Sequence, residues 1–112
     1  MRHVNNVVYL RWVQEVAIAH WRSIAPDDAL AEVAWVARRH EIDYERPATL
    51  GDELVLATWV GRAEGLSFER FTEIRHADGR VAARARTLWV PIDPTTGRPK
   101  RVSAEVRGLF SV

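Results

Sequence analysis

The sequence predicts an α+β domain in which one long helix packs against an antiparallel sheet of four strands. The first observation is an early segment, Asn6–Trp21, which is apolar around most of a helical circumference and too long for a strand. The second is a series of later segments rich in β-branched, aromatic or alternating apolar residues, joined by short turns. The third is the length of 112 residues, which suits one domain with one modest core. We therefore expect residues 1–112 to form a single unit.

The helix over Asn6–Trp21 is the first predicted element. Asn6 is expected to cap it, because its side chain can accept a hydrogen bond from the first-turn amides. Its polar positions form one narrow stripe: Arg11, Gln14, Glu15 and Arg22. A helix this apolar is normally buried on most sides, so we expect the sheet to wrap around it. Pro26-Asp27-Asp28 marks a break after it.

The strands are predicted over Ala34–Glu45, Leu54–Val60, Leu66–Arg75 and Val81–Ile92. The turns between them are signalled by Leu50-Gly51-Asp52, by Ala63-Glu64-Gly65 and, most strongly, by the hairpin pair Asp78-Gly79. On the last strand Ala83, Ala85, Thr87 and Trp89 alternate onto one face, and the small residues there would let the helix approach closely. A short helix capped by Ser103 is expected over Ser103–Phe110. A sheet of this kind has two edges, which favour pairing into a dimer.

Composition excludes several classes of function. The formal charge is only +1, so no overall field would hold a nucleic acid or an anionic membrane. The absence of cysteine excludes disulfides, thiolate metal sites and a cysteine nucleophile. His20, His40 and His76 show no spacing with carboxylates that indicates a metal, and we expect neither metal nor cofactor. No signal peptide and no membrane span is visible, so a cytoplasmic location is expected.

Three motifs at consistent spacing carry a resemblance to a known family. Residues 3–12 read HVNNVVYLRW, residues 44–54 read YERPATLGDEL, and residues 83–90 read ARARTLWV. They resemble the HVNN-x-x-Y-L-x-W, Y-x-x-P-A-x-x-G-D-x-L and A-x-A-x-T-x-W-V patterns of hot-dog-fold acyl-CoA thioesterases. Within that family the chain is most similar to the branch of 4-hydroxybenzoyl-CoA thioesterase-like enzymes and plant acyl-ACP thioesterases.

The resemblance implies a curved antiparallel sheet wrapped around one long central helix. It also implies hydrolysis of an acyl-CoA, or of an acyl-ACP, to a free acid without a cofactor. In the family the thioester binds at a dimer interface, so a homodimer or a dimer of dimers is expected. A hot-dog dehydratase or hydratase is a further alternative, but the sequence context of its acid–base His is not found here.

One departure from the family pattern bears on catalysis. The family has a strand and an acidic residue, usually Asp, upstream of the His, whereas this sequence begins two residues before His3. We expect the full protein to start upstream of Met1 and to include both features. A protein that lacked both features would be a catalytically impaired module for acyl-CoA or acyl-ACP binding, or for dimerisation.

The candidate catalytic residues lie near the start of the helix. The amides of Asn6–Val8 could stabilise an oxyanion, because they sit at the positive end of the helix dipole. His3 could polarise the carbonyl or orient water, and Asn5 or Asn6 could bind the carbonyl or water. Tyr9 could donate to the substrate, although a core tyrosine is the commoner case. Glu15 could act as a base across a dimer interface, or be a solvated or paired surface residue.

The candidate substrate-binding residues fall into two groups. The apolar residues that could line an acyl tunnel, or form ordinary core, are Val8, Trp12, Trp35, Trp59, Phe68 and Phe71. Val7 is a further candidate for binding the substrate. Arg98, Lys100 and Arg101 follow a turn and could bind the phosphates of coenzyme A, or form a solvated basic loop.

Overall fold

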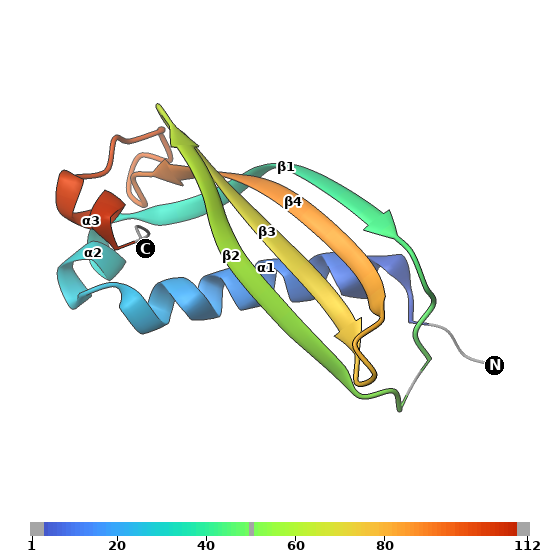
Figure 1. Cartoon of the computed structure of the whole chain (residues 1–112). Helices are drawn as coiled ribbons and strands as arrows, with labels where there is room; N and C mark the ends of the chain where they lie inside the picture. The colour runs from blue at the N-terminus through green and yellow to red at the C-terminus, as the bar shows by residue number, and fades with distance from the viewer. Residues whose placement is uncertain (1–3, 50, 110–112) are drawn as a thin grey trace.

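A helix of 19 residues, α1 (Asn6–Ile24), crosses one face of a four-stranded antiparallel sheet (Figure 1). The computed structural model describes residues 4–49 and 51–109. The other elements are α2 (Asp27–Glu32), β1 (Ala34–Tyr44), β2 (Leu54–Glu64), β3 (Ser67–His76), β4 (Val81–Ile92) and α3 (Ala104–Gly108). The predicted α+β class, with a long helix on an antiparallel sheet, is confirmed.

The sheet has the strand order β1-β4-β3-β2, and every neighbouring pair is antiparallel. The β3–β4 hairpin turns at Asp78-Gly79, as predicted. Asp78 Oδ1 accepts a hydrogen bond from the Arg80 amide, and Gly79 has a φ of +89°, a region that favours glycine. The order places β1 and β2 at the two edges of the sheet.

Strand β2 is longer than predicted. The sequence predicts its end at Val60 and a turn at Ala63-Glu64-Gly65, but β2 continues to Glu64 and the chain turns at Gly65-Leu66. The register with β3 shifts between Val60 and Ala63. This irregularity absorbs extra residues and lets pairing resume, so the glycine and charged residues that suggest a loop belong to a bulged strand.

Asn5, and not the predicted Asn6, caps α1. Asn5 has an extended backbone, and its Oδ1 accepts from the Val7 amide at 2.9 Å. Asn6 is the first helical residue. Both asparagines have the side-chain chemistry of a cap, so only the backbone conformation distinguishes them.

One stripe of α1 faces the sheet. Its buried residues are spaced four apart: Tyr9, Val13, Ala17 and Trp21. Tyr9 and Val13 pack with Ile74 of β3 and with the small residues Ala83 and Ala85 of β4. The prediction that the helix is buried on most sides is wrong for the described chain, because the four strands cover one side of it. Val7 and Ile18 are 69% and 39% exposed.

Two short helices cover the C-terminal end of α1. Trp21 packs with Ala29 and Val33, which lie in and directly after α2, and with Val106 of α3. The sequence predicts only a break at the start of α2, because six residues are too few to show a helical period. The predicted cap of α3 is confirmed, since Ser103 Oγ accepts from the Val106 amide at 3.2 Å. None of the helices in the described part of the chain is long and apolar enough to span a membrane.

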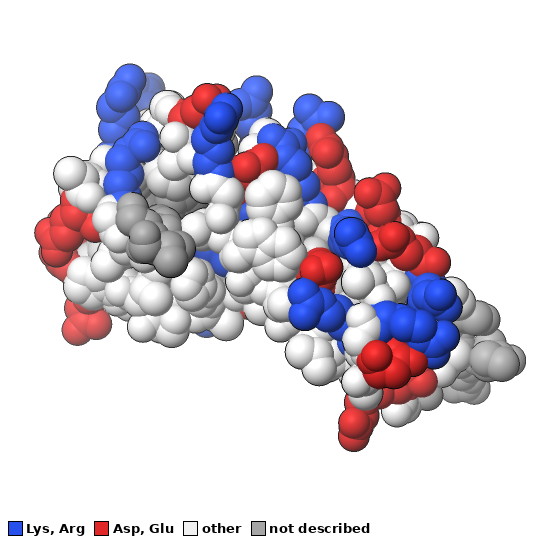
Figure 2. Space-filling view, in the orientation of Figure 1, with Lys and Arg blue, Asp and Glu red and all other residues white. Residues whose placement is uncertain are grey.

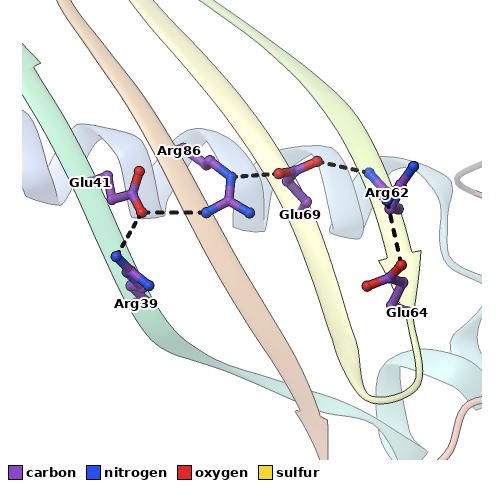
Figure 3. Close-up of polar contacts among 6 residues, drawn as sticks. All are labelled: Arg39, Glu41, Arg62, Glu64, Glu69 and Arg86. Atoms are coloured by element: carbon purple, nitrogen blue, oxygen red, sulfur yellow. Dashed lines mark hydrogen bonds and ion pairs between the residues drawn. The ribbon is translucent and has the colours of Figure 1, made fainter.

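The sheet face turned away from α1 carries a ladder of alternating charges (Figure 3). Arg86 donates to Glu69 at 2.5 Å and pairs with Glu41 at 3.4 Å, and Arg39 pairs with Glu41 at 3.0 Å. At the other end, the Arg62 amide donates to Glu69 Oε1 at 3.0 Å. The space-filling view likewise shows the two signs of charge interleaved (Figure 2), in keeping with the balanced composition.

Candidate active site

The N-terminus of α1 borders a pocket that it shares with the segment between β1 and β2. The pocket is lined by Val4, Asn5, Val8, Trp12, Thr49, Gly51, Asp52 and Leu54. Two hydrogen bonds join the segments. The Val4 amide donates to the Ala48 carbonyl at 2.7 Å, and the Ala48 amide donates to the Tyr9 hydroxyl at 3.1 Å. The fold thus brings together two motifs that are distant in the sequence.

The helix N-terminus offers hydrogen-bond donors to this pocket. Asn5 occupies two amides of the first turn, because its Oδ1 accepts from Val7 and its carbonyl accepts from Val8, each at 2.9 Å. Of the three amides expected to stabilise an oxyanion, only that of Asn6 has no such bond, and a first-turn N–H has no acceptor within the helix. Since Oδ1 of Asn5 makes the cap, its Nδ2 group keeps two N–H donors for a ligand. The positive end of the helix dipole lies at the same place.

Asp52 supplies a carboxylate to the lining of the pocket. Its Oδ2 accepts from the Thr49 amide at 2.7 Å, and its own amide donates to the Thr49 carbonyl at 3.1 Å. The hydrogen bond from the Thr49 backbone is the main reason that the pKa of Asp52 lies below its ordinary value. Asp52 is therefore ionised near neutral pH. The sequence predicts only a turn at Asp52, and the signal for a further role is its place in the Gly-Asp pair of a family motif.

Three of the predicted residues line the pocket and others do not. Asn5, Val8 and Trp12 line it. Asn6 is exposed, and its carbonyl accepts from the Tyr44 hydroxyl at 3.3 Å. Val7 is 69% exposed.

Tyr9 is only 2% exposed, and its hydroxyl accepts from the Ala48 amide. This bond fixes the loop of the pocket to α1, which is a structural role. His3 lies outside the described residues.

The remaining candidates lie away from the pocket in the same chain. Glu15 has a side chain that is 63% exposed and pairs with Arg11 at 3.8 Å. Lys100 donates to the carbonyl of Glu32 at the end of α2, which places its loop beyond the C-terminal end of α1. Because α1 spans about 28 Å, the cluster of Arg98, Lys100 and Arg101 is distant from its own pocket. Among the residues that the structure describes, no three His, Asp or Glu side chains are grouped as metal ligands would be.

The chain is similar in sequence to known thioesterases. The model of the thioesterase-like superfamily matches residues 1–110. The long-chain acyl-CoA thioesterase FadM of Escherichia coli K12 is 30% identical over 112 aligned positions, which cover 95% of this chain and 83% of FadM. A chloroplastic palmitoyl-acyl carrier protein thioesterase of Gossypium hirsutum is 28% identical over 106 positions, covering 86% of this chain. The chain spans only 26% of that plant protein's length.

Solved structures show the same fold. A thioesterase of Thermus thermophilus, solved with coenzyme A and zinc, superposes with a TM-score of 0.84 at 27% identity, covering 99% of this chain and 86% of that one. The probable thioesterase YbaW of Escherichia coli gives a TM-score of 0.78 at 29% identity, covering 96% and 84%. The chain has the hot-dog fold and belongs to the thioesterase-like superfamily.

Proposed function

We propose that this protein hydrolyses acyl thioesters in the pocket at the N-terminus of α1. The observation that carries the proposal is that the Nδ2 donors of Asn5 and the ionised carboxylate of Asp52 line one pocket, with the Asn6 amide at the adjoining helix end. Membership of the thioesterase-like superfamily supports it.

The proposed mechanism uses the helix end to bind the thioester carbonyl. The Asn5 Nδ2 group and the Asn6 amide would donate to the carbonyl oxygen, and the helix dipole would stabilise the negative charge that develops there. Asp52 would hold a water molecule and take its proton as the water oxygen attacks the carbonyl carbon. Collapse of the tetrahedral intermediate then breaks the C–S bond and releases the thiolate. His3 is a second candidate for orienting the water.

We further propose that the substrate is an acyl-CoA and that two copies complete the site. The basic cluster of Arg98, Lys100 and Arg101 suits the phosphates of coenzyme A, but it lies at the opposite end of α1 from its own pocket. An antiparallel second copy would place one copy's cluster beside the other's pocket, with Val8 and Trp12 lining the start of the acyl tunnel. The edges at β1 and β2 support a homodimer or a dimer of dimers. Glu15 would act as a base only from the partner of such a pair.

The test is release of free thiol from a panel of acyl-CoA esters, short to long and one aromatic, followed with a thiol reagent. The protein contains no cysteine, so every thiol detected comes from coenzyme A. We expect saturable thiol release by the wild type and a strong loss of activity in Asp52→Asn. A comparable loss in Glu15→Gln would instead identify Glu15 as the base that acts across a dimer interface. A parallel series on acyl-ACP esters, followed by the free acid formed, identifies the carrier. Binding of acyl-CoA or acyl-ACP without any hydrolysis would overturn the proposal in favour of an acyl-binding module.

A further inference from the structure

A second cavity lies along the C-terminal half of α1, between that helix and the sheet, with lining residues from all four strands. Its volume is about 60 Å³, and its walls include Ala17, Trp21, Val60 and Phe68. Its lining also includes Ile18, which is 39% exposed, and the exposed residues Arg62 and Ala63 of β2. None of its lining residues belongs to the pocket at the N-terminus of α1. It is therefore separate from the pocket in which hydrolysis is proposed.

Arg70 brings a buried positive charge to this cavity. The residue is 5% exposed, and its guanidinium donates to Thr58 Oγ1 at 3.1 Å and to His20 Nδ1 at 2.9 Å. The two acceptors are uncharged groups. Over residues 4–49 and 51–109, no ion pair of a carboxylate with Arg70 is formed. A buried cation without an anion is costly, and the guanidinium has further N–H donors to offer.

Trp89 adds a second donor on the neighbouring strand. The residue is 7% exposed, and its indole Nε1–H is buried without a hydrogen-bond partner in the described structure. Indole nitrogen can only donate, so it needs an acceptor. Buried polar groups in folded proteins are nearly always paired, and an orphaned one calls for an explanation. Two buried donors, Arg70 and Trp89, thus border the cavity; Arg62 also lines it, but its exposed guanidinium pairs with Glu64 at 3.5 Å.

We propose that this cavity binds the carboxylate of an apolar carboxylic acid. The carboxylate would neutralise Arg70 and accept a hydrogen bond from Trp89, while the apolar stem would lie against the cavity wall and leave past Ile18. Glu69 also borders the cavity, but its oxygens are engaged by the Arg86 side chain and the Arg62 amide on the outer face of the sheet. The carboxylate has two chemical sources: a free acid, or the far end of an acyl group that ends in a second carboxylate.

The test compares octanoate with octan-1-ol, a neutral ligand with the same stem, by calorimetry and by quenching of tryptophan fluorescence. We expect octanoate to bind at least about tenfold more tightly, as a charge-assisted hydrogen bond requires. Arg70→Met should remove this preference, and Trp89→Phe, which keeps a ring but loses the N–H, should reduce it. Arg84→Met and Trp59→Phe, which alter exposed residues on the outer face, are the matched controls and should leave binding unchanged.

Equal binding of the two ligands, no binding of either, or full octanoate binding by a folded Arg70→Met protein would each overturn the proposal. If Arg70→Met does not fold, the Trp89→Phe result decides. These binding measurements use no thioester, so their outcome is independent of the test of hydrolysis.

A second experiment separates the two sources of the carboxylate. Hydrolysis of an acyl-CoA whose acyl group ends in a carboxylate is compared with hydrolysis of its methyl-ended counterpart. A lower KM that depends on Arg70 identifies the substrate as the source, and octanoate binding without such a difference identifies the free acid.

Discussion

Gly61 lies where β2 is displaced in register against β3, and its missing side chain leaves room for Glu69. A Cβ at this position would collide with the Glu69 carboxylate and with the ring edge of Phe71. We expect Gly61→Ala to lower the free energy of unfolding by about 1–3 kcal/mol, because neither neighbour can move without breaking a contact. Urea denaturation measures this. Gly108→Ala is the control, since its Cβ would meet nothing within 4 Å; equal stability of both variants would refute the argument.

Glu69 links the charge ladder to acid stability. The Arg62 backbone amide first, and the Arg86 guanidinium second, hold the pKa of Glu69 below its ordinary value of 4.5. The folded pKa lies below the unfolded one. The stabilisation is therefore complete above pH 4.5 and is lost as the pH falls through the folded value.

We expect Glu69→Gln to be about 1 kcal/mol less stable than the wild type at pH 7, with the difference shrinking below pH 4. Unfolding curves at both pH values measure it. Glu64→Gln is the control, because its 74% exposed side chain makes only a surface ion pair. A difference that stays constant from pH 7 to pH 3 would contradict the assignment.

For single residues, the sequence predicts the chemical role of a side chain better than its place in the fold. The motif containing Asn5 and Asn6 correctly marks the helix start, but either residue can cap a helix, and the choice depends on backbone angles. Asp52 and Arg70 could not be placed in cavities from the sequence, because the surfaces that enclose them come from distant strands and α1.

At the scale of elements, the cap residue Asn5 stabilises α1 through its Oδ1 atom and is also proposed to bind substrate through its Nδ2 group. Asn5→Ala should lower the free energy of unfolding by about 0.5–2 kcal/mol, because the Val7 amide loses its acceptor. Asn5→Asp keeps an acceptor and places a negative charge at the positive end of the helix dipole, so its stability should match or exceed that of the wild type. Thermal and urea unfolding of the three proteins measure this. Equal loss in both variants would show that the side-chain oxygen does not cap the helix.

Elements with a clear period are predicted well and irregular ones are not. The buried face of β4 follows the predicted alternation, with Ala83, Ala85 and Trp89 facing α1. The continuation of β2 past Gly61 depends on a register shift against β3, which no pattern within β2 reveals. The sequence predicts more burial of α1 than the structure shows, because apolar composition does not reveal how much of a helix the sheet covers.

At the scale of the whole molecule, the two halves of the proposed site lie at opposite ends of one chain. If two antiparallel copies complete it, a mixture of two inactive variants should regain activity. We expect this for Asn5→Ala mixed with a protein in which Arg98, Lys100 and Arg101 are all alanine. Half of the dimers would be mixed, each with one intact site, giving about a quarter of the wild-type activity after subunit exchange. Thiol release and sedimentation measure the outcome; a monomer with full activity would contradict it.

In the proposed reaction the helix end, through Asn5, stabilises the oxyanion of thioester hydrolysis. Asn5→Asp tests it most directly, because it retains the cap while replacing the Nδ2 donors with an anion. The measurement is kcat for acyl-CoA hydrolysis by this variant, made at a temperature where unfolding shows it to be as stable as the wild type. We expect kcat to fall by about 10²- to 10³-fold, the loss typical of removing one oxyanion donor. An Asn5→Asp protein that keeps the wild-type kcat would contradict the claim.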